Sequence, residues 1–126
     1  MTAPTTISSN FPIIQVPFGS SSTGDLSADA TSDQIAVVYH VRRAVLAIQA
    51  VFTGVPDGIL DLQCSLDADN WTNDANSSAM IRGSGGQIIW DRGTTGIPFW
   101  RVRFRKTQGA SSSGTLTVKA HGKIYS

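Results

Sequence analysis

The stretch IPFWRVRFRK, from Ile97 to Lys106, decides the fold class of this chain, because its side chains alternate strictly in character. Apolar residues and arginines occupy alternate positions: Trp100, Val102 and Phe104 against Arg101, Arg103 and Arg105. A period of two is typical of a strand that is buried on one face, since successive side chains leave opposite faces of the pleat. We therefore predict a strand whose apolar face is covered by a second layer and whose other face carries cations.

A second alternating stretch, GTLTVKAHGK from Gly114 to Lys123, follows after the loop TQGASSS. Its apolar positions are Leu116, Val118 and Ala120, and Thr117, Lys119 and His121 stand between and after them. The loop between the two stretches is rich in Ser, so the simplest prediction is a β-hairpin. In that hairpin the cations of both strands would share one face as a basic stripe, formed by Arg101, Arg103, Arg105, Lys119 and Lys123.

The composition fits one all-β domain. The chain has 126 residues, of which 15% are charged, and Ser, Thr and Gly are abundant, which suits a fold with many turns. The formal net charge is +1, so no global field favours nucleic acid or an anionic membrane. The single cysteine, Cys64, excludes a disulfide within the chain.

The first residues and the hydropathy give an expectation about location. The start, MTAPTTISSN, has no basic cluster and no apolar run, so we expect no secretory signal. No apolar stretch approaches the roughly 20 residues of a spanning helix, so we expect no membrane insertion. We expect the protein to act in a cytoplasm or in a particle assembled there.

Residues 1–33 differ from the rest of the chain. They are rich in Ser and Thr, contain no Lys or Arg, and are punctuated by Pro4, Pro12 and Pro17. Prolines on both sides of an apolar segment favour an extended conformation. We predict that residues 1–33 form an extended arm outside a sandwich domain at 34–126. The apolar residues of this arm would contact this chain or a neighbour: Phe11, Ile13, Ile14, Val16 and Phe18. The alternative is an ordinary edge strand after a frayed terminus.

Between the arm and the basic strands, strand-like segments alternate with turn sequences. Residues 34–41 are apolar on both faces, and Ala44–Phe52 is rich in apolar and β-branched residues and ends at the turn TGVPDG. Residues 59–66 alternate, which predicts an inner set, Leu60, Leu62, Cys64 and Leu66, and an outer set, Asp61, Gln63 and Ser65. Shorter segments follow at 79–82 and 87–91. Recurring turn signals without a convincing helix predict a single antiparallel β-sandwich, jelly-roll-like in type.

No catalytic or cofactor motif is complete in this sequence. The loop from Gly109 to Gly114 has the outer spacing of a phosphate-binding P-loop, but Thr115-Leu116 stands where Lys and Ser or Thr are required. There is no Gly-x-Ser-x-Gly elbow, and the sequence identifies no partner for His40 or His121. We therefore predict that the protein is not an enzyme and that it uses no cofactor or metal.

The loop after residue 66 has two interpretations, a calcium-binding loop and an ordinary turn. Its hard oxygen ligands are as close together as in a calcium loop: Asp67, Asp69, Asn70 and Asp74. The EF-hand spacing is missing, however, and Asp and Asn also favour turns because their side chains bond to the local backbone. Trp71 is expected to fold this loop onto the sandwich, with carbohydrate stacking as the alternative.

The basic stripe also has two interpretations. Like charges opposite one another across strands cost stability, so Asp61 or Asp91 on a neighbouring strand is expected to balance them in an ordinary charge ladder. The functional alternative is an acidic protein surface that docks on the stripe. Nucleic acid is the weaker version, because the aromatic residues alternate inward and leave no exposed stacking platform.

Several short segments from about Ala44 onward occur in a recognisable order. They are Val51-Phe-Thr-Gly-Val-Pro-Asp-Gly58, Leu62-Gln-Cys-Ser-Leu-Asp67, Asn70-Trp71-Thr72, Phe99-Trp-Arg-Val-Arg-Phe104, Ser113-Gly-Thr-Leu-Thr-Val118 and Gly122-Lys123. In this ordered set the chain resembles a family of small β-sandwich virion proteins of tailed bacteriophages, of the head decoration, fibre and collar types. The resemblance implies a structural role on a phage particle and brings no catalytic residues. It does not extend to residues 1–33.

Together, the resemblance and the predicted arm imply a capsid decoration (cement) protein. It would bind the outer shell of the virion and bridge capsomers through its arm, as a homotrimer whose several arms raise avidity. The expected partners are the major capsid protein or neighbouring virion proteins, with no membrane and no direct nucleic acid contact. The first alternative is a tail, collar or fibre-base adsorption component. The second is a lectin-like carbohydrate-binding module with Trp71 at its site.

Overall fold

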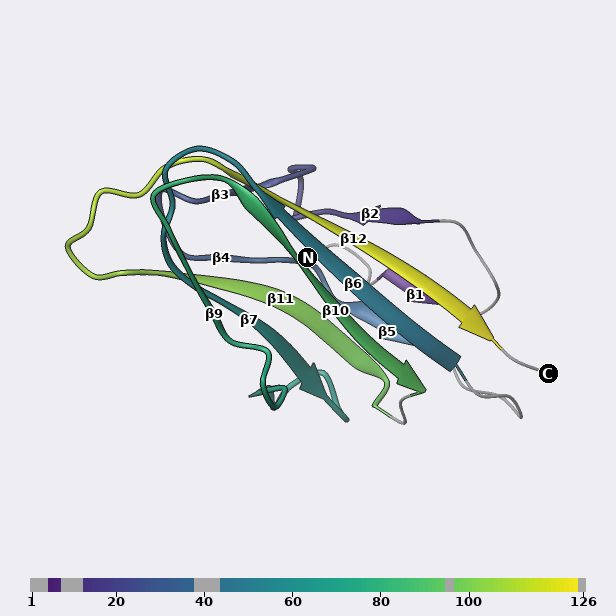
Figure 1. The fold of residues 1–126 in the computed structure, drawn as a ribbon. Coiled ribbons are helices and arrows are strands. Elements are labelled where there is room, and N and C mark those ends of the chain that lie inside the picture. Colours follow the sequence, from purple (N-terminus) through teal and green to yellow (C-terminus); the bar gives the residue numbers. More distant parts are fainter. Residues whose placement is uncertain (1–4, 8–12, 38–43, 95–96, 125–126) are drawn as a thin grey trace.

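The chain folds as a β-sandwich, which confirms the predicted fold class (Figure 1). The computed structural model describes residues 5–7, 13–37, 44–94 and 97–124, and within these ranges strands and turns occur without a helix. The strands are β1 (Thr5–Ile7), β2 (Ile14–Val16), β3 (Gly24–Asp25), β4 (Ala30–Thr31), β5 (Ile35–Val37), β6 (Ala44–Phe52), β7 (Asp57–Ser65), β8 (Thr72–Asn73), β9 (Ala79–Arg82), β10 (Gly86–Thr94), β11 (Phe99–Lys106) and β12 (Thr115–Ile124).

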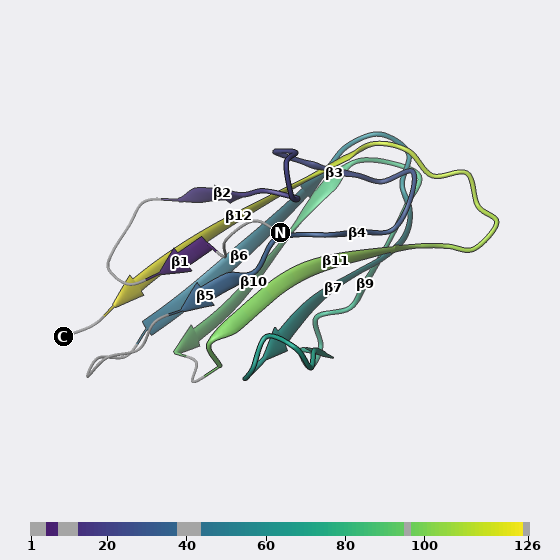
Figure 2. The same cartoon turned by 180° about the vertical axis from the view of Figure 1, so that it is seen from behind.

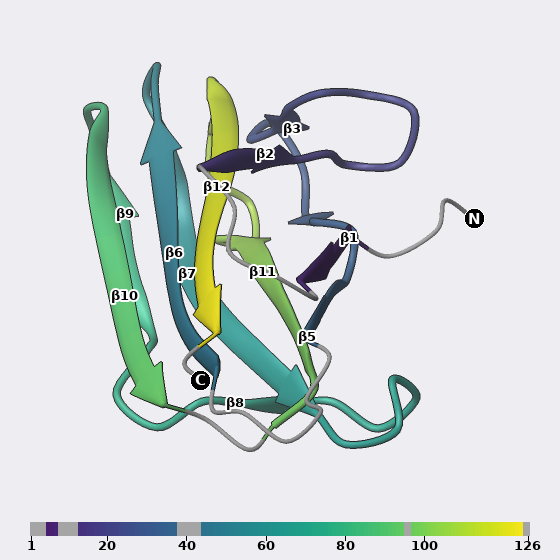
Figure 3. The same ribbon diagram turned by 90° about the vertical axis from the view of Figure 1, so that its right-hand side faces the viewer.

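Two sheets form the layers of the sandwich. The larger sheet has the order β1-β5-β11-β7-β8, with β4 paired to β11 and β9 paired to β7. The smaller sheet has the order β10-β6-β12-β2, with β3 paired to β12. Figure 3 shows β10, β6 and β12 side by side in one layer and β7 and β11 in the other. Among the described pairs, β1 with β5 is parallel and the others are antiparallel.

The apolar positions of the alternating strands meet between the two sheets. Trp100, Val102 and Phe104 of β11 are buried, and so are Leu116 and Val118 of β12. Their burial confirms the predicted inner faces of both strands. Full burial of a large apolar side chain contributes about 1.5–3 kcal/mol, so these positions hold the two layers together. β6 likewise confirms the strand predicted at 44–52.

The predicted hairpin between β11 and β12 is wrong. β11 pairs with β7 over eight positions from Phe99 to Lys106, whereas β12 pairs with β6 in the other sheet from Leu116 to Ile124. The connection at 107–114 extends beyond the ends of the neighbouring strands and joins the two layers (Figures 1 and 2). Sheets in a sandwich lie about 10 Å apart, a gap that a loop of this length spans easily. Each strand therefore pairs with a long partner in a different layer.

The predicted boundary between an arm and a domain at Asp33 is also corrected. β2, β3 and β4 lie before that residue, and all three pair with strands of the sandwich. Val16 is fully buried in the core, and Ile14 and Phe18 pack against it. The described part of residues 1–33 thus matches the alternative of an edge strand, because Val16 gains more by joining the core than by staying on a free arm.

Two predictions for β7 need a correction. Leu66 was expected inside, but β7 ends at Ser65 and the Leu66 side chain is 75% exposed. Asp61, Gln63 and Ser65 occupy the outer face, yet all three are buried. Side chains of β11 and of the loop that follows β7 cover this face.

Candidate functional site

A network of charged and polar side chains covers the outer face of the larger sheet, centred on Asp61. In the register between β7 and β11, Asp61 lies directly opposite Arg103. Its Oδ2 accepts hydrogen bonds from Arg105 Nε at 3.0 Å and from an Arg103 terminal nitrogen at 3.3 Å. Its Oδ1 accepts a hydrogen bond from the Ser78 hydroxyl. The Asp61 side chain is fully buried, while those of Arg103 and Arg105 are 30% and 45% exposed.

The pKa of Asp61 reflects two opposing effects. Burial of the carboxylate acts to raise its pKa, but the hydrogen bonds from Ser78 and Arg105, with the charge of Arg105, outweigh it. The pKa of Asp61 is therefore lowered, and the group is a carboxylate at neutral pH. A buried carboxylate held in this way is a poor proton donor, because its proton is lost well below neutrality. This arrangement is the charge ladder that the sequence predicted for Asp61.

Arg101 occupies the next outward position of β11 and has different partners. Its Nε donates to Gln63 Oε1 at 2.8 Å, and its guanidinium lies 4.1 Å from the centre of the Trp71 ring. Gln63 in turn donates to Asn73 Oδ1 on β8 at 3.1 Å. Trp71 also donates from Nε1 to the carbonyl of Ala68. One face of this indole is thus occupied by a cation, which disfavours the proposed sugar-stacking role for Trp71.

The predicted basic stripe is not one surface. Its arginines, Arg101, Arg103 and Arg105, lie on β11 of the larger sheet, and we call them the arginine row. Lys119 and Lys123 belong to β12 of the smaller sheet. The outer faces of the two layers of a sandwich point in opposite directions, so the exposed Lys119 cannot join the arginines in one docking surface. The side chain of Lys123 lies outside the described residues.

The outer face of the smaller sheet carries a shallow groove of about 320 Å³. Ile13 and Ile89, which are 66% and 62% exposed, contribute to its walls together with Lys119 and His121. Gln49 of β6 donates to Gln87 of β10 across this face. Of the residues predicted for the arm, Ile13 is therefore the one with an exposed side chain among those described, and Phe11 lies outside the described residues.

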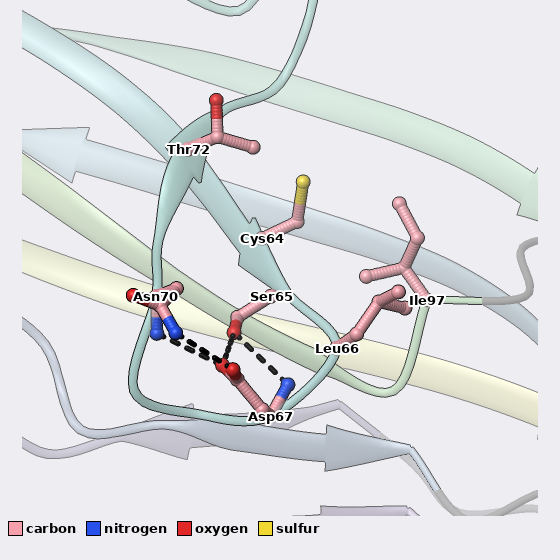
Figure 4. Close-up of a pocket in the computed structure, with 7 residues that line it drawn as sticks. All are labelled: Cys64, Ser65, Leu66, Asp67, Asn70, Thr72 and Ile97. Atoms are coloured by element: carbon pink, nitrogen blue, oxygen red, sulfur yellow. Dashed lines mark hydrogen bonds between the residues drawn. The ribbon is translucent and has the colours of Figure 1, made fainter.

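A second hollow, of about 330 Å³, lies beside the end of β7 (Figure 4). Its lining includes Cys64, Leu66, Asp67, Asn70 and Ile97. Burial, and then the charge of Asp74, raise the pKa of the Cys64 thiol, while Arg92 acts against this shift. The thiol is therefore kept protonated at neutral pH, the form that is poor as a nucleophile or metal ligand.

The acidic loop beside this hollow is organised as a turn. Asp67 Oδ1 accepts backbone hydrogen bonds from Asp69 at 2.9 Å and Asn70 at 2.8 Å, and Oδ2 accepts one from Asn70 Nδ2. These hydrogen bonds lower the pKa of Asp67, and those from Asn70 have the largest effect. Asp74 points elsewhere and pairs with Arg92 of β10. The geometry favours the turn over the calcium alternative, and in the described ranges no group of three or more acidic, His or Cys residues is placed to hold a metal.

The sequence did not identify the serines that fasten this loop to the sandwich. Ser77 Oγ donates to the Leu62 carbonyl and accepts from the Leu62 amide, and its own carbonyl accepts from Trp90 Nε1. Ser78 binds Asp61. Serines in a polar loop carry no periodic signal, because their partners are set by how the loop folds back on β7.

Comparisons with known proteins add no relative: no family model matches the chain, and no curated protein matches it significantly. In the described part of the chain, no helix is long and apolar enough to cross a membrane. The inferences below therefore depend on the fold, its surfaces and the ordered sequence segments.

Proposed function

We propose that this protein is a structural protein of a tailed-phage particle that decorates the capsid. In this proposal it is not an enzyme, and it acts by binding the major capsid protein or a neighbouring virion protein on the outer shell. The observation that carries the proposal is that the segments resembling phage virion proteins contact one another in the fold. They lie far apart in the sequence, so their contacts make them one framework.

The first of these contacts joins the turn after β6 to the start of β12. Thr53 N donates to the Thr115 carbonyl at 3.0 Å, and Val55 and Ser113 exchange two backbone hydrogen bonds of 3.1 Å. Gly114 has a φ of +122° and passes so close to the opposite chain that a Cβ would lie 1.8 Å from the Thr53 carbonyl oxygen. Only glycine fits such a crossing. The segments 51–58 and 113–118 therefore depend on each other.

The second contact joins the loop after β7 to β11. Trp71, from the segment Asn70 to Thr72, packs against Arg101 of the segment Phe99 to Phe104. The segment that ends at Asp67 is tied to the same loop by the hydrogen bonds from Asn70. The resemblance thus falls on residues that build the scaffold. This supports a shared architecture with virion proteins. In this proposal, the residues that bind the partner lie on the outer faces of the two sheets.

The proposed bridging of capsomers needs a different contact surface from the predicted arm. Ile14, Val16 and Phe18 pack on this chain's own core, so they do not form an arm that reaches a neighbour. We assign the contact with the shell to the outer faces of the two sheets. A homotrimer would present each face three times, and several weak contacts made together would give a high avidity.

Binding to capsids tests the proposal. Purified protein should co-sediment with capsids of the phage that encodes it, and immunogold labelling should spread over the head. Light scattering should give three times the chain mass of 13.4 kDa. Labelling confined to one vertex would support the tail or collar alternative instead, and a failure to bind any part of the particle would refute a virion role.

A further inference from the structure

We propose that the arginine row on the outer face of the larger sheet binds an extended acidic protein segment whose carboxylates stand at alternate positions. The inference deepens the proposed function, on which it rests, because it names the chemistry of the surface that a virion protein of this kind would meet. The geometry of β11, the charge balance around Asp61 and the neighbouring apolar surface carry it.

The spacing of the arginines defines the shape of the partner. Arg101, Arg103 and Arg105 leave β11 on the same face, and two residues of a strand advance by about 6.8 Å. An extended segment laid along β11 presents every second side chain at the same interval. Carboxylates at alternate positions would therefore meet successive guanidinium groups, each with charge-assisted hydrogen bonds.

The charges on this face are only partly balanced within the chain. Asp61 pairs with Arg103 and Arg105, whereas Arg101 forms no ion pair within the described residues and has the neutral Gln63 as its hydrogen-bond partner. Burial, and then the charge of Arg103, lower the pKa of Arg101. Cations that repel one another favour an incoming carboxylate.

The surface beside the row suits a protein partner. Arg105 lies opposite Ile59 of β7, which lies opposite Met80 of β9. Met80 is 68% exposed, so an apolar side chain is available in line across the sheet with Arg105, the most exposed member of the arginine row. Arginine and methionine are enriched in protein interfaces.

Nucleic acid fits this face less well. Unspecific binding of single strands uses aromatic rings on which bases stack, and the Trp71 ring is already covered on one face by Arg101. The net charge of +1 gives no general attraction to a polyanion. An oligonucleotide is therefore the competitor in the test rather than the expected partner.

A pair of labelled peptides tests the geometry by fluorescence polarisation at low salt. One peptide alternates Glu with Thr, and the other has the same composition with its glutamates in one block. The alternating peptide should bind the full chain more tightly, and its affinity should fall as salt is added. Equal binding of both peptides, or tighter binding of a single-stranded oligonucleotide, would overturn the inference.

A matched pair of variants tests the location. Arg101→Gln removes a cation without taking a partner from Asp61, and Lys119→Gln removes one from the opposite face. We expect Arg101→Gln to weaken the alternating peptide about tenfold and Lys119→Gln to leave it unchanged. If Arg101→Gln does not fold, as judged by circular dichroism, Arg105→Gln replaces it, because Arg103 and Ser78 still hold Asp61. If Arg101→Gln and Lys119→Gln weaken binding of the alternating peptide equally, the arginine row is not the binding surface.

Capsid binding of the same variants separates this inference from the proposed function. If wild type and Arg101→Gln bind capsids equally well, the protein is a virion component but the arginine row is not its docking surface. If wild type binds the alternating peptide and no part of the particle, the inference holds and the virion role fails.

Discussion

The outer faces of the two sheets show how the same sequence pattern leads to different surfaces. On the larger sheet, the outward residues of β7 and β11 bind one another, and Asp61 is buried beneath two arginines. On the smaller sheet, the groove near β6 and β12 is bordered by exposed isoleucines, Ile13 and Ile89. Each face includes one strand that alternates apolar and polar residues, β11 on the larger sheet and β12 on the smaller. The difference arises from the partner strands, because a polar residue is buried only where its neighbour satisfies it.

A substitution in the core between the two sheets should cause the largest loss of stability. Phe104→Ala removes a fully buried ring that packs tightly against Gly58, so we expect a loss of about 3–5 kcal/mol in the free energy of unfolding. Ile89→Ala on the outer face of the smaller sheet should change it by less than about 0.5 kcal/mol. Urea denaturation measures both values, and similar losses would mean that the core is placed wrongly.

Removal of the Asp61 charge should have the next largest effect. Asp61→Asn keeps the shape of the side chain but leaves Arg103 and Arg105 without a countercharge. Breaking a buried ion pair costs about 3–5 kcal/mol, and because both arginines are partly exposed we expect a smaller loss, about 2 kcal/mol. Lys119→Gln is the control on the opposite face and should stay within about 0.5 kcal/mol of wild type. If the two variants lose the same stability, the contrast between the faces is not real.

The smallest expected effect is a difference in acid sensitivity. The folded pKa of Asp61 is lowered from an ordinary value of 3.8, so the folded state binds the proton more weakly than the unfolded state. This carboxylate therefore contributes stability that is fully present above the unfolded pKa and is lost as the pH falls from about 4 toward the folded pKa. Thermal melts across this range should show wild type losing more stability than Asp61→Asn. Parallel curves would show that the Asp61 carboxylate is not stabilised by folding.

The alternation of apolar residues and arginines along β11 made part of the network around Asp61 predictable. Arginines on one face of a strand require a countercharge, and Asp61 was one of two candidates that the sequence offered. Ser78 and the contact between Trp71 and Arg101 were not predictable, because they depend on how the loop after β7 folds back. The hairpin failed for a related reason: a serine-rich loop fits a turn within a sheet as well as a crossing between sheets.

By itself, the sequence determined which side chains of β11 and β12 face the core. Trp100, Val102 and Phe104 are buried because every second side chain of a strand faces the same way, and this is a property of the backbone alone. Only the tertiary structure decided which strands became neighbours, and with them the separation of Lys119 from the arginine row. Pairing joins residues far apart along the chain, and the pairing that buries the most apolar surface while satisfying the backbone prevails over the nearest one in sequence.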